Sequence, residues 1–473
     1  MTHTPVSGTE QAWAALGGDP ALLARIETAG PAGLLPARLP VSELARATVA
    51  VCSLAAAELA ARRTGGPVPL VRIDDGAVAT AFVSERHLRI DGRAPANFAP
   101  LSRFWRTADG WVRTHANYPH HRARLLATLG LSADTADEPA VDAVAASFAG
   151  RRAAEIERTV YAAGGLAVAA RTPGEWAADP RRIALSGVPL VRRERIDAAP
   201  VRRTAPLTGV PLRPAAGLRV LDLTRVTAGP VATRTLALLG ADVLRIDAPQ
   251  LPESQDAHND TGFGKRSVSI DLASRAGRAS FDELLAGADV VVTGYRPGAL
   301  DRFGLAPDSL AARRPGLVIA RLSAWGHGPW ARQRGFDSVV QVATGIAVAE
   351  AGPGAPDGPP GALPAQALDH GTGYLLAGAV LRALTEQHDE GGSRLATLSL
   401  ARTAAWLTDE IPAPADPAAQ DGTYAPEKWL TETDSPVGRL RHALPPVAFD
   451  GAPADWSRPP GPLGADAAAW LTA

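Results

Sequence analysis

Four short apolar runs, separated by intervals long enough for a helix, constrain the fold of this chain more than any other feature. The runs occupy residues 218–224, 242–247, 289–295 and 317–323. Strands that alternate with helices pair in parallel and bury both faces of their sheet. Pro230, shortly after the first run, is placed to open the following helix. We therefore predict an α/β fold with a doubly wound, mostly parallel, Rossmann-like sheet.

The composition indicates a globular protein. The chain has 473 residues, 46% of them hydrophobic, and a formal net charge of −1. It should form two or three domains with ample core. It is not basic enough to suggest nucleic acid binding or acidic enough to suggest disorder. We expect no apolar run of membrane-spanning length and no signal peptide, and hence a cytoplasmic location.

Single residues exclude several kinds of site. Cys52 is the only cysteine, so disulfides within the chain and cysteine zinc clusters are excluded, and its alanine-rich surroundings predict a buried helix. No G-x-G-x-x-G follows the first apolar run, so a nicotinamide cofactor is not expected. Lys265 and Lys428 are the only lysines. Lys265 therefore stands out among the many arginines.

Three ordered motifs resemble a known family. They are TRVTAGP at 224–230, GKRSVSIDL at 264–272 and GYRPGALDRFGL at 294–305. The set is similar to the family III CoA-transferases, the group of formyl-CoA, carnitine and bile-acid transferases that includes α-methylacyl-CoA racemase as a cousin. The resemblance covers residues 218–409 best. It implies acyl-CoA and carboxylate substrates, no metal and no tightly bound cofactor.

Asp369 has two interpretations. It comes just ahead of an apolar helix, where a carboxylate commonly caps free amides. The resemblance instead implies that Asp369 is the covalent nucleophile, because the family carries an Asp at this junction. A carboxylate that attacks a thioester needs a pre-organised, partly dehydrated site, and the glycine-rich helix start would let a substrate approach.

The resemblance also implies residues that bind CoA. Any one arginine is more often a solvated surface charge, but the family motifs point to loop amides and cations at one edge of the sheet. The matching positions are Val226, Thr227, Ala228, Lys265, Arg296, Arg302 and Arg334.

Departures from the family pattern bear on the reaction. The racemase branch has a His where this chain has Phe336, so a two-base proton shuttle lacks one partner, although His370 lies beside Asp369. Many members carry Glu-Arg after the second strand, where this chain has Asp247 and Ala248. Substrate choice should depend on pocket shape near Trp325 and Phe336, although core packing is the commoner role for Trp325.

The order of segments is unusual. Residues 104–115 and 163–180 resemble small-domain segments but precede the large domain. Residues 42–66 align without gaps on 368–392, which places Glu43 on Asp369 and a Gly pair on a Gly pair. We interpret this as a partial tandem fusion, with Glu43 as a relic or structural cap. The expected parts are an N-terminal helical segment (1–95), a small α+β domain (96–200), a linker (201–214), a large CoA-binding α/β domain (215–410) and a returning tail (411–473). The Arg- and Pro-rich stretch 191–206 lacks helical periodicity and is interpreted as the connector between the halves.

The predicted function is that of an acyl-CoA:carboxylate CoA-transferase that works through an aspartyl-CoA intermediate. Two alternatives stay open: an acyl-CoA isomerase or racemase of the same fold, and a catalytically silent homologue that binds CoA. The expected partners are small molecules, with no nucleic acid and no membrane. We expect a homodimer or a pseudo-dimeric monomer, since family members form intertwined dimers.

Overall fold

The computed structural model describes residues 6–31, 33–95, 98–251, 253–351, 358–413 and 424–471. Its largest sheet has seven strands in the order β10-β9-β8-β11-β12-β13-β7. All neighbouring pairs are parallel except β13 with β7. The four apolar runs form strands as predicted. The strands are β7 (Arg192–Arg195), β8 (Arg219–Leu223), β9 (Asp242–Asp247), β10 (Arg266–Ser269), β11 (Val290–Thr293), β12 (Val318–Ser323) and β13 (Arg394–Ser399).

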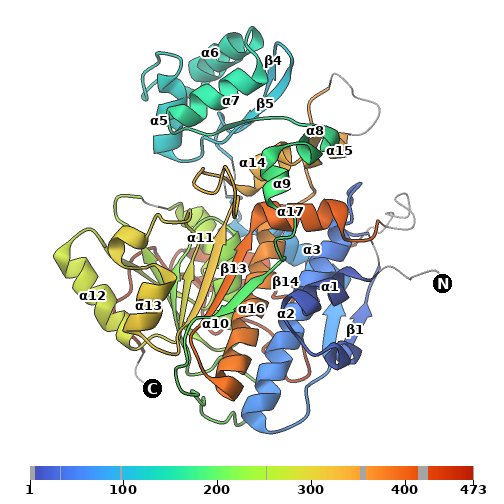
Figure 1. The fold of residues 1–473 in the computed structure, drawn as a ribbon, viewed down its shortest axis with the longest axis vertical. Helices are drawn as coiled ribbons and strands as arrows, with labels where there is room; N and C mark the ends of the chain where they lie inside the picture. The colour runs from blue at the N-terminus through green and yellow to red at the C-terminus, as the bar shows by residue number, and fades with distance from the viewer. Residues whose placement is uncertain are drawn as a thin grey trace.

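Both faces of this sheet are buried, which explains why its strands are nearly continuous apolar runs. Val290 and Val292 belong to the core that includes helices α10 (Ala228–Leu238) and α16 (Ala367–Glu390). Val291 belongs to the core on the opposite face, with helices α12 (Arg275–Ala286) and α13 (Pro307–Arg313). Figure 1 shows α12 and α13 on one side of the strands and α16 on the other. The prediction of a mixed α/β fold with a mostly parallel sheet is confirmed.

The strand order creates a switch point between β8 and β11. From β8 the chain winds through β9 to β10, whereas β11, β12 and β13 extend from the other side of β8. The loops after β8 and β11 therefore diverge at the carboxyl edge of the sheet, where doubly wound folds bind ligands. Helix α10 begins at Ala228, so Pro230 lies in its first turn and does not open it.

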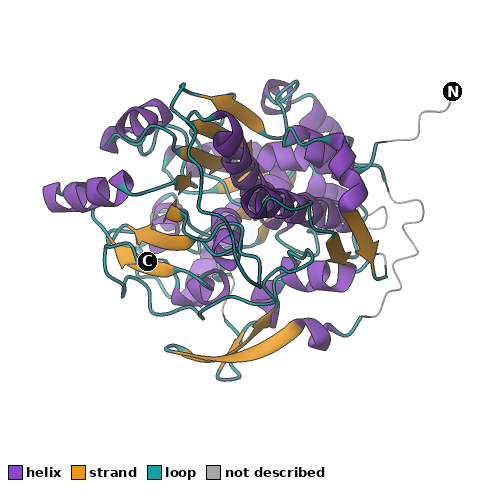
Figure 2. Ribbon diagram, turned by 90° about the horizontal axis from the view of Figure 1, so that it is seen from below, coloured by secondary structure: helices purple, strands orange, loops and turns teal. Residues whose placement is uncertain are grey.

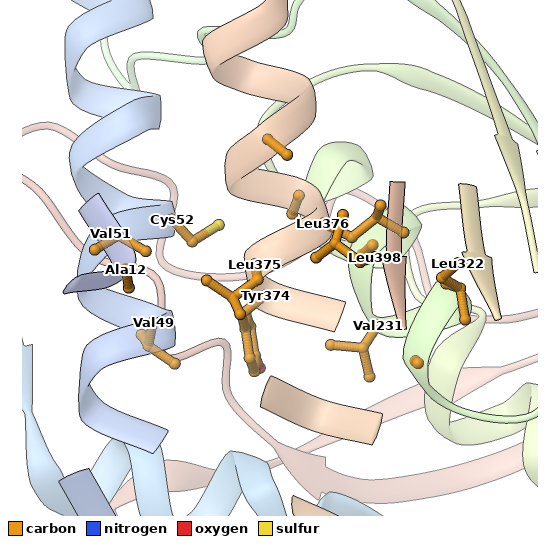
Figure 3. Close-up of a cluster of buried hydrophobic side chains, with 14 of the residues drawn as sticks. Ala12, Val49, Val51, Cys52, Val231, Leu322, Tyr374, Leu375, Leu376 and Leu398 are labelled. Atoms are coloured by element: carbon orange, nitrogen blue, oxygen red, sulfur yellow. The ribbon is translucent and has the colours of Figure 1, made fainter. Parts of the chain in front are cut away.

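The longest helix of the N-terminal segment, α2 (Val41–Thr64), packs along α16. Figure 3 shows Val49, Val51 and Cys52 of α2 on one side of a shared core and Tyr374, Leu375 and Leu376 of α16 on the other. Cys52 is fully buried, as predicted. Within the described part of the chain, α2 is the one helix long and apolar enough to cross a membrane, contrary to expectation, but 94% of its apolar window is buried inside the protein.

The two aligned segments have similar structures. Helices α2 and α16 each contain 24 residues, and each ends at a glycine with positive φ, Gly65 or Gly391. A strand parallel to an earlier one follows in both cases: β2 (Val71–Asp74) pairs with β1 (Ile26–Ala29), and β13 pairs with β12. Helices α3 (Asp75–Phe82) and α17 (Leu400–Asp409) come next. The two segments therefore share the same order of elements, and the internal repeat itself stays a prediction.

A small lobe lies above the main body in Figure 1. It consists of an antiparallel sheet of β4 (Phe104–Thr107), β5 (Gly110–Thr114) and β6 (Ala167–Ala169), with helices α5 (Pro119–Ala127), α6 (Asp137–Ala149) and α7 (Ala153–Ala162). The lobe has its own core, formed around Trp105, Phe148 and Ile156. The chain then returns through α8 (Pro173–Ala177) and α9 (Pro180–Ala184).

The connector and the tail add strands that the sequence did not predict. Residues 191–206 were expected to be a linker throughout, but 192–195 form the antiparallel edge strand β7. In the tail, β14 (Leu430–Ser435) and β15 (Gly438–Ala443) form a hairpin that pairs with β3 (Arg89–Ile90). Residues 414–423 of the predicted tail lie outside the described residues. Viewed from below, helices and strands are mixed throughout the molecule (Figure 2).

Candidate active site

A cavity of ≈ 570 Å³ lies at the switch point of the sheet. Its wall combines residues from four parts of the chain, within 85–119, 226–227, 253–261 and 336–366. The first part includes α4 (Ser84–His87) and the start of the small lobe, and the third includes α11 (Gln255–Thr261). Segments that are distant in sequence therefore close one cavity.

The loop after β8 forms one end of the cavity. Val226 and Thr227 line it, while Ala228 is buried at the start of α10. Val226 has a φ of 70°, which is unusual and strained for a β-branched residue. Its amide donates to Glu253 Oε2 at 3.3 Å. Thr227 is the N-cap residue of α10, and no side chain caps this helix end. The strained loop thus brings main-chain groups to the cavity wall.

Asp369 lies directly behind this wall. Helix α16 starts at Ala367 with Gln366 as its N-cap residue, so Asp369 occupies the third helical position and the capping interpretation is wrong. Gln366, Phe336 and Ser338 line the cavity, but Asp369 itself does not. Its buried Oδ2 finds no hydrogen-bond partner among the described residues. A buried carboxylate oxygen without a partner is expensive to keep and points to a functional role.

Asp337, the first residue of α14 (Asp337–Ala343), fixes the start of α16. Its Oδ2 accepts hydrogen bonds from the amides of Leu368 at 3.0 Å and Asp369 at 3.1 Å. Burial raises the pKa of Asp337 to about 6, although these bonds and the one from Gln341 oppose the rise. Burial, together with the charges of Asp337 and Glu85, raises the pKa of Asp369 well above its ordinary value. Asp369 therefore holds its proton more tightly than an ordinary aspartate.

Glu85 and His370 complete this cluster. Glu85 lines the cavity, and its Oε2 lies 3.6 Å from Nε2 of the fully buried His370, which is longer than a hydrogen bond. Burial favours a higher pKa for Glu85, but the proximity of His370 outweighs it and leaves that pKa below its usual value. Both ring nitrogens of His370 lack hydrogen-bond partners in the described part of the structure. His370 also stacks on Phe82 of α3, with ring centroids 5.3 Å apart.

An aromatic wall closes the side toward the small lobe. His115 stacks face to face on Phe336, with ring centroids 3.8 Å apart and an interplanar angle of 2°. Burial and the charge of Arg113 lower the pKa of His115 to about 3, so its imidazole is neutral. The hydroxyl of Tyr118 donates to Glu253 Oε1 at 2.9 Å. Trp325 does not belong to this wall: its indole is buried and donates to the carbonyl of Arg334 at 3.0 Å.

Lys265 does not reach the cavity. Its side chain is completely buried, and Nζ contacts Asp222 Oδ2 at 3.1 Å and donates to the carbonyl of Pro230 at 2.9 Å. Burial lowers the pKa of Lys265 to about 8, although Asp222 opposes the decrease. The lysine therefore ties β10 to the end of β8 and the first turn of α10.

The predicted arginines also lie outside the cavity lining. Arg296 is exposed, and its Nη1 donates to the carbonyl of Arg332 at 3.0 Å. Partial burial and the nearby charges of Arg296 and Arg124 lower the pKa of Arg334. Arg302 is exposed on η2 (Asp301–Phe303), 4.6 Å above the Phe303 ring. Arg124, Arg296 and Arg334 thus form a positively charged group at the junction of the small lobe and the sheet.

Residues 104–115 were identified from the sequence as a small-domain segment, but it was not predicted that Glu85, His115 and Tyr118 reach the cavity. These three residues precede Asp369 by more than two hundred positions. Nothing in their local pattern separates them from ordinary helix and loop residues. No group of three or more His, Cys, Asp or Glu side chains among the described residues is arranged to hold a metal ion.

Comparisons with known proteins agree with the motifs. Residues 215–414 match the model of CoA-transferase family III. A probable fatty acyl-CoA transferase of Mycobacterium tuberculosis is 35% identical over 198 residues, which are 39% of this chain and 50% of that protein. A formyl-CoA:oxalate CoA-transferase of Streptomyces coelicolor is 35% identical over 186 residues, 37% of this chain and 45% of the relative.

A solved structure of a hypothetical protein from Mycobacterium tuberculosis is 35% identical, with a TM-score of 0.38. The aligned part covers 41% of this chain and 57% of that one. The chain spans about half the length of the curated relatives it matches. The matched part contains β8 to α17, and with them Asp369 and the loop at Val226. Residues 215–414 therefore belong to CoA-transferase family III.

Proposed function

We propose that the protein is an acyl-CoA:carboxylate CoA-transferase in which Asp369 is the nucleophile. The observation that carries the proposal is the buried, unpaired Oδ2 of Asp369, directly behind the wall of the cavity at the switch point. The family membership of residues 215–414 supports CoA thioesters as substrates. We also propose that the enzyme is cytoplasmic and that it acts as a homodimer or as a pseudo-dimeric monomer.

The proposed reaction is a chain of acyl transfers. The ionised carboxylate of Asp369 attacks the thioester carbonyl carbon, the C–S bond breaks, and CoA leaves as a thiolate. The thiolate then attacks the aspartyl carbonyl of the mixed anhydride, which releases the donor acid and leaves an aspartyl-CoA thioester. An acceptor carboxylate reverses both steps and leaves with CoA. The main-chain amide of Thr227, at the uncapped start of α10, is suited to stabilise the oxyanion of each addition, whereas the Val226 amide already donates to Glu253.

The arrangement of charges suggests where CoA would lie. Phosphates need cations, and Arg124, Arg296 and Arg334 supply three of them. Arg296 and Arg124 lie close enough to Arg334 to lower its pKa, and no carboxylate contributes to that shift. Val226, Thr227 and Ala228 would approach the CoA with main-chain atoms. We assign Lys265 to holding this loop in place, because its ammonium is occupied by Asp222 and Pro230.

A second candidate is an acyl-CoA isomerase or racemase. His115 supplies an imidazole on the cavity wall against Phe336, so a second proton-transfer group is present although Phe336 cannot act as one. Exchange of the substrate α-proton in deuterated water, without CoA transfer, would favour this candidate.

The test is covalent trapping. Purified protein is incubated with acyl-CoA donors, quenched with hydroxylamine or borohydride, and digested for peptide mass spectrometry. We expect modification of Asp369 and none in Asp369→Asn. Asp282→Asn is the matched control, because Asp282 is an exposed residue of α12. An unmodified Asp369 in protein that binds these donors would refute the transferase mechanism for them and leave the isomerase and the silent CoA-binding protein.

A further inference from the structure

The cavity beside Asp369 has a size that bears on the acyl group. Pockets of roughly 300–1,000 Å³ bury most of a drug-sized ligand, and this cavity has ≈ 570 Å³. A formyl or acetyl group would leave much of that space unfilled. Unfilled apolar space forfeits contacts and binding energy.

The cavity walls are rich in rigid apolar groups. Leu88, Pro100, Pro119 and Phe336 line it from α4, the small lobe and the segment before α14. Phe336 is held in place by its stacking on His115. Rigid apolar and aromatic walls favour a bulky apolar group, and an aromatic ring can also stack against them.

The charges on the wall argue against an anionic acyl group. Glu85, Glu253, Asp256 and Asp260 all line the cavity, whereas no Lys or Arg does among the described residues. Three of these acids already form ion pairs with arginines that lie outside the lining. The pairs are Arg225 with Glu253 at 3.3 Å, Arg93 with Asp256 at 2.9 Å and Arg234 with Asp260 at 3.3 Å.

Glu85 reinforces this bias. Its Oε2 lacks a hydrogen-bond partner in the described structure, and its nearest basic groups are His370 and Arg86, each at 3.6 Å. A second carboxylate on the substrate would lose its hydration and meet acidic oxygens without a cation of its own. Burial of a charge without a partner is strongly unfavourable.

We propose that this cavity binds a bulky, uncharged, apolar acyl group, ring-bearing or branched, and excludes small dicarboxylic acyl groups. The inference rests on the proposed function, since it takes the cavity as the acyl site of Asp369. The volume, the rigid apolar walls and the acidic lining without a Lys or Arg among its described residues each favour the same class of substrate.

Matched pairs of donors test size and charge separately. Rates of Asp369 acylation are measured with acetyl-CoA against phenylacetyl-CoA, and with succinyl-CoA against 4-methylpentanoyl-CoA, which has the same shape without the charge. We expect the bulky and the uncharged member of each pair to react at least about tenfold faster per unit concentration. A preference for acetyl-CoA or for succinyl-CoA would overturn the proposal.

A cavity-filling variant locates the effect. Ala257 lines the cavity on α11, so Ala257→Trp should slow phenylacetyl transfer at least about tenfold more than acetyl transfer. The control is Ala276→Trp on the exposed surface of α12, which should change neither rate. Equal slowing of both donors by Ala257→Trp would contradict the assignment of the cavity.

Failure of the proposed function gives a different result. If no donor modifies Asp369, the two pairs are compared by calorimetric binding to the Asp369→Asn protein. The same ranking would uphold the preference of the cavity while the covalent mechanism fails. Equal or reversed affinities would overturn the inference about the acyl group itself.

Discussion

Asp369, Asp337 and Glu85 show how neighbouring side chains set the chemistry of a single carboxyl group. Oδ2 of Asp337 accepts from the amides of Leu368 and Asp369, whereas Oδ2 of Asp369 has no hydrogen-bond partner among the described residues. The aspartate in the position expected of a cap is therefore not the one that binds amides. Only the neighbours of each carboxylate distinguish the two.

The first prediction concerns the pH dependence of acylation. Attack requires the ionised form of Asp369, and its raised pKa means that acylation falls as pH decreases, beginning at a higher pH than for an ordinary aspartate. The charge of Glu85 contributes to that rise. Glu85→Gln should therefore shift the acidic limb of the profile to lower pH. Single-turnover acylation across the pH range measures it.

The control for this profile is Glu432→Gln, which removes an equal charge from the exposed hairpin strand β14. It should leave the acidic limb where it is. An unchanged limb in Glu85→Gln, or a shift to higher pH, would contradict electrostatic coupling between Glu85 and Asp369.

The second prediction uses the two lysines of the chain as a matched pair. Lys265→Met leaves Asp222 buried without its cation and should lower the free energy of unfolding by about 3–5 kcal/mol. Lys428→Met removes an exposed ammonium 3.4 Å from Asp74 and should change stability by less than about 0.5 kcal/mol. Urea unfolding of both variants measures the difference. Similar losses in both would show that Lys265 is not a structural ion-pair partner.

At the scale of elements, α16 approaches its neighbours through glycines. A Cβ on Gly373 would lie 2.6 Å from the carbonyl oxygen of Ala228, whereas one on Gly371 would lie 2.6 Å from the end of the Leu44 side chain. A backbone carbonyl at the start of α10 cannot move without the loop at Val226, but a leucine side chain can rotate. Helix α16 therefore has a contact at Gly373 that cannot relax and a contact at Gly371 that can.

The third prediction compares these positions. Gly373→Ala should destabilise the protein by about 1–3 kcal/mol through overpacking. Gly371→Ala should be nearly neutral, because alanine favours the helix by about 1 kcal/mol and offsets the rearrangement of Leu44. Thermal unfolding of both variants tests this. Equal effects would mean that the carbonyl of Ala228 is not the rigid element assumed here.

The elements that the sequence predicted well are those whose burial is uniform. Strands β8, β9, β11 and β12 appear where apolar runs were found, since burial on both faces removes any polar alternation. Strand β7 was missed because it is an edge strand of four charged residues, Arg192–Arg195. All four side chains are charged and are exposed or half-buried, so no apolar pattern marks the strand.

At the scale of the whole molecule, the candidate site is assembled from distant parts of one chain. The family-matched segment supplies Asp369 and the loop at Val226, while residues 85–119 supply Glu85, His115 and Tyr118. Helix α2 covers α16 from the same N-terminal part. The fusion interpretation stays a prediction. In the structure, residues of the N-terminal part and of the family-matched part of one chain line the cavity together.

The fourth prediction follows from this enclosure. Activity per chain should stay constant over a roughly thousand-fold dilution, because mass action affects only sites that need a second chain. Parallel sedimentation measurements give the oligomeric state at each concentration. A loss of activity that tracks dissociation would show that a partner chain contributes to the site.

The sequence by itself determined the α/β class, the positions of four strands of the large sheet, the buried Cys52 helix and the motifs of residues 215–414. These depend on local periodicity and on residue types at fixed spacing, which a linear chain displays directly. It also selected Asp369, but only through resemblance.

Only the tertiary structure decided that Lys265 is occupied by Asp222, that Asp337 binds the amides at the start of α16, and that Glu85 and His115 reach the cavity. The physical reason is that burial and pairing of a charge depend on which segments meet in space. Those meetings join residues tens to hundreds of positions apart, and no local pattern records them.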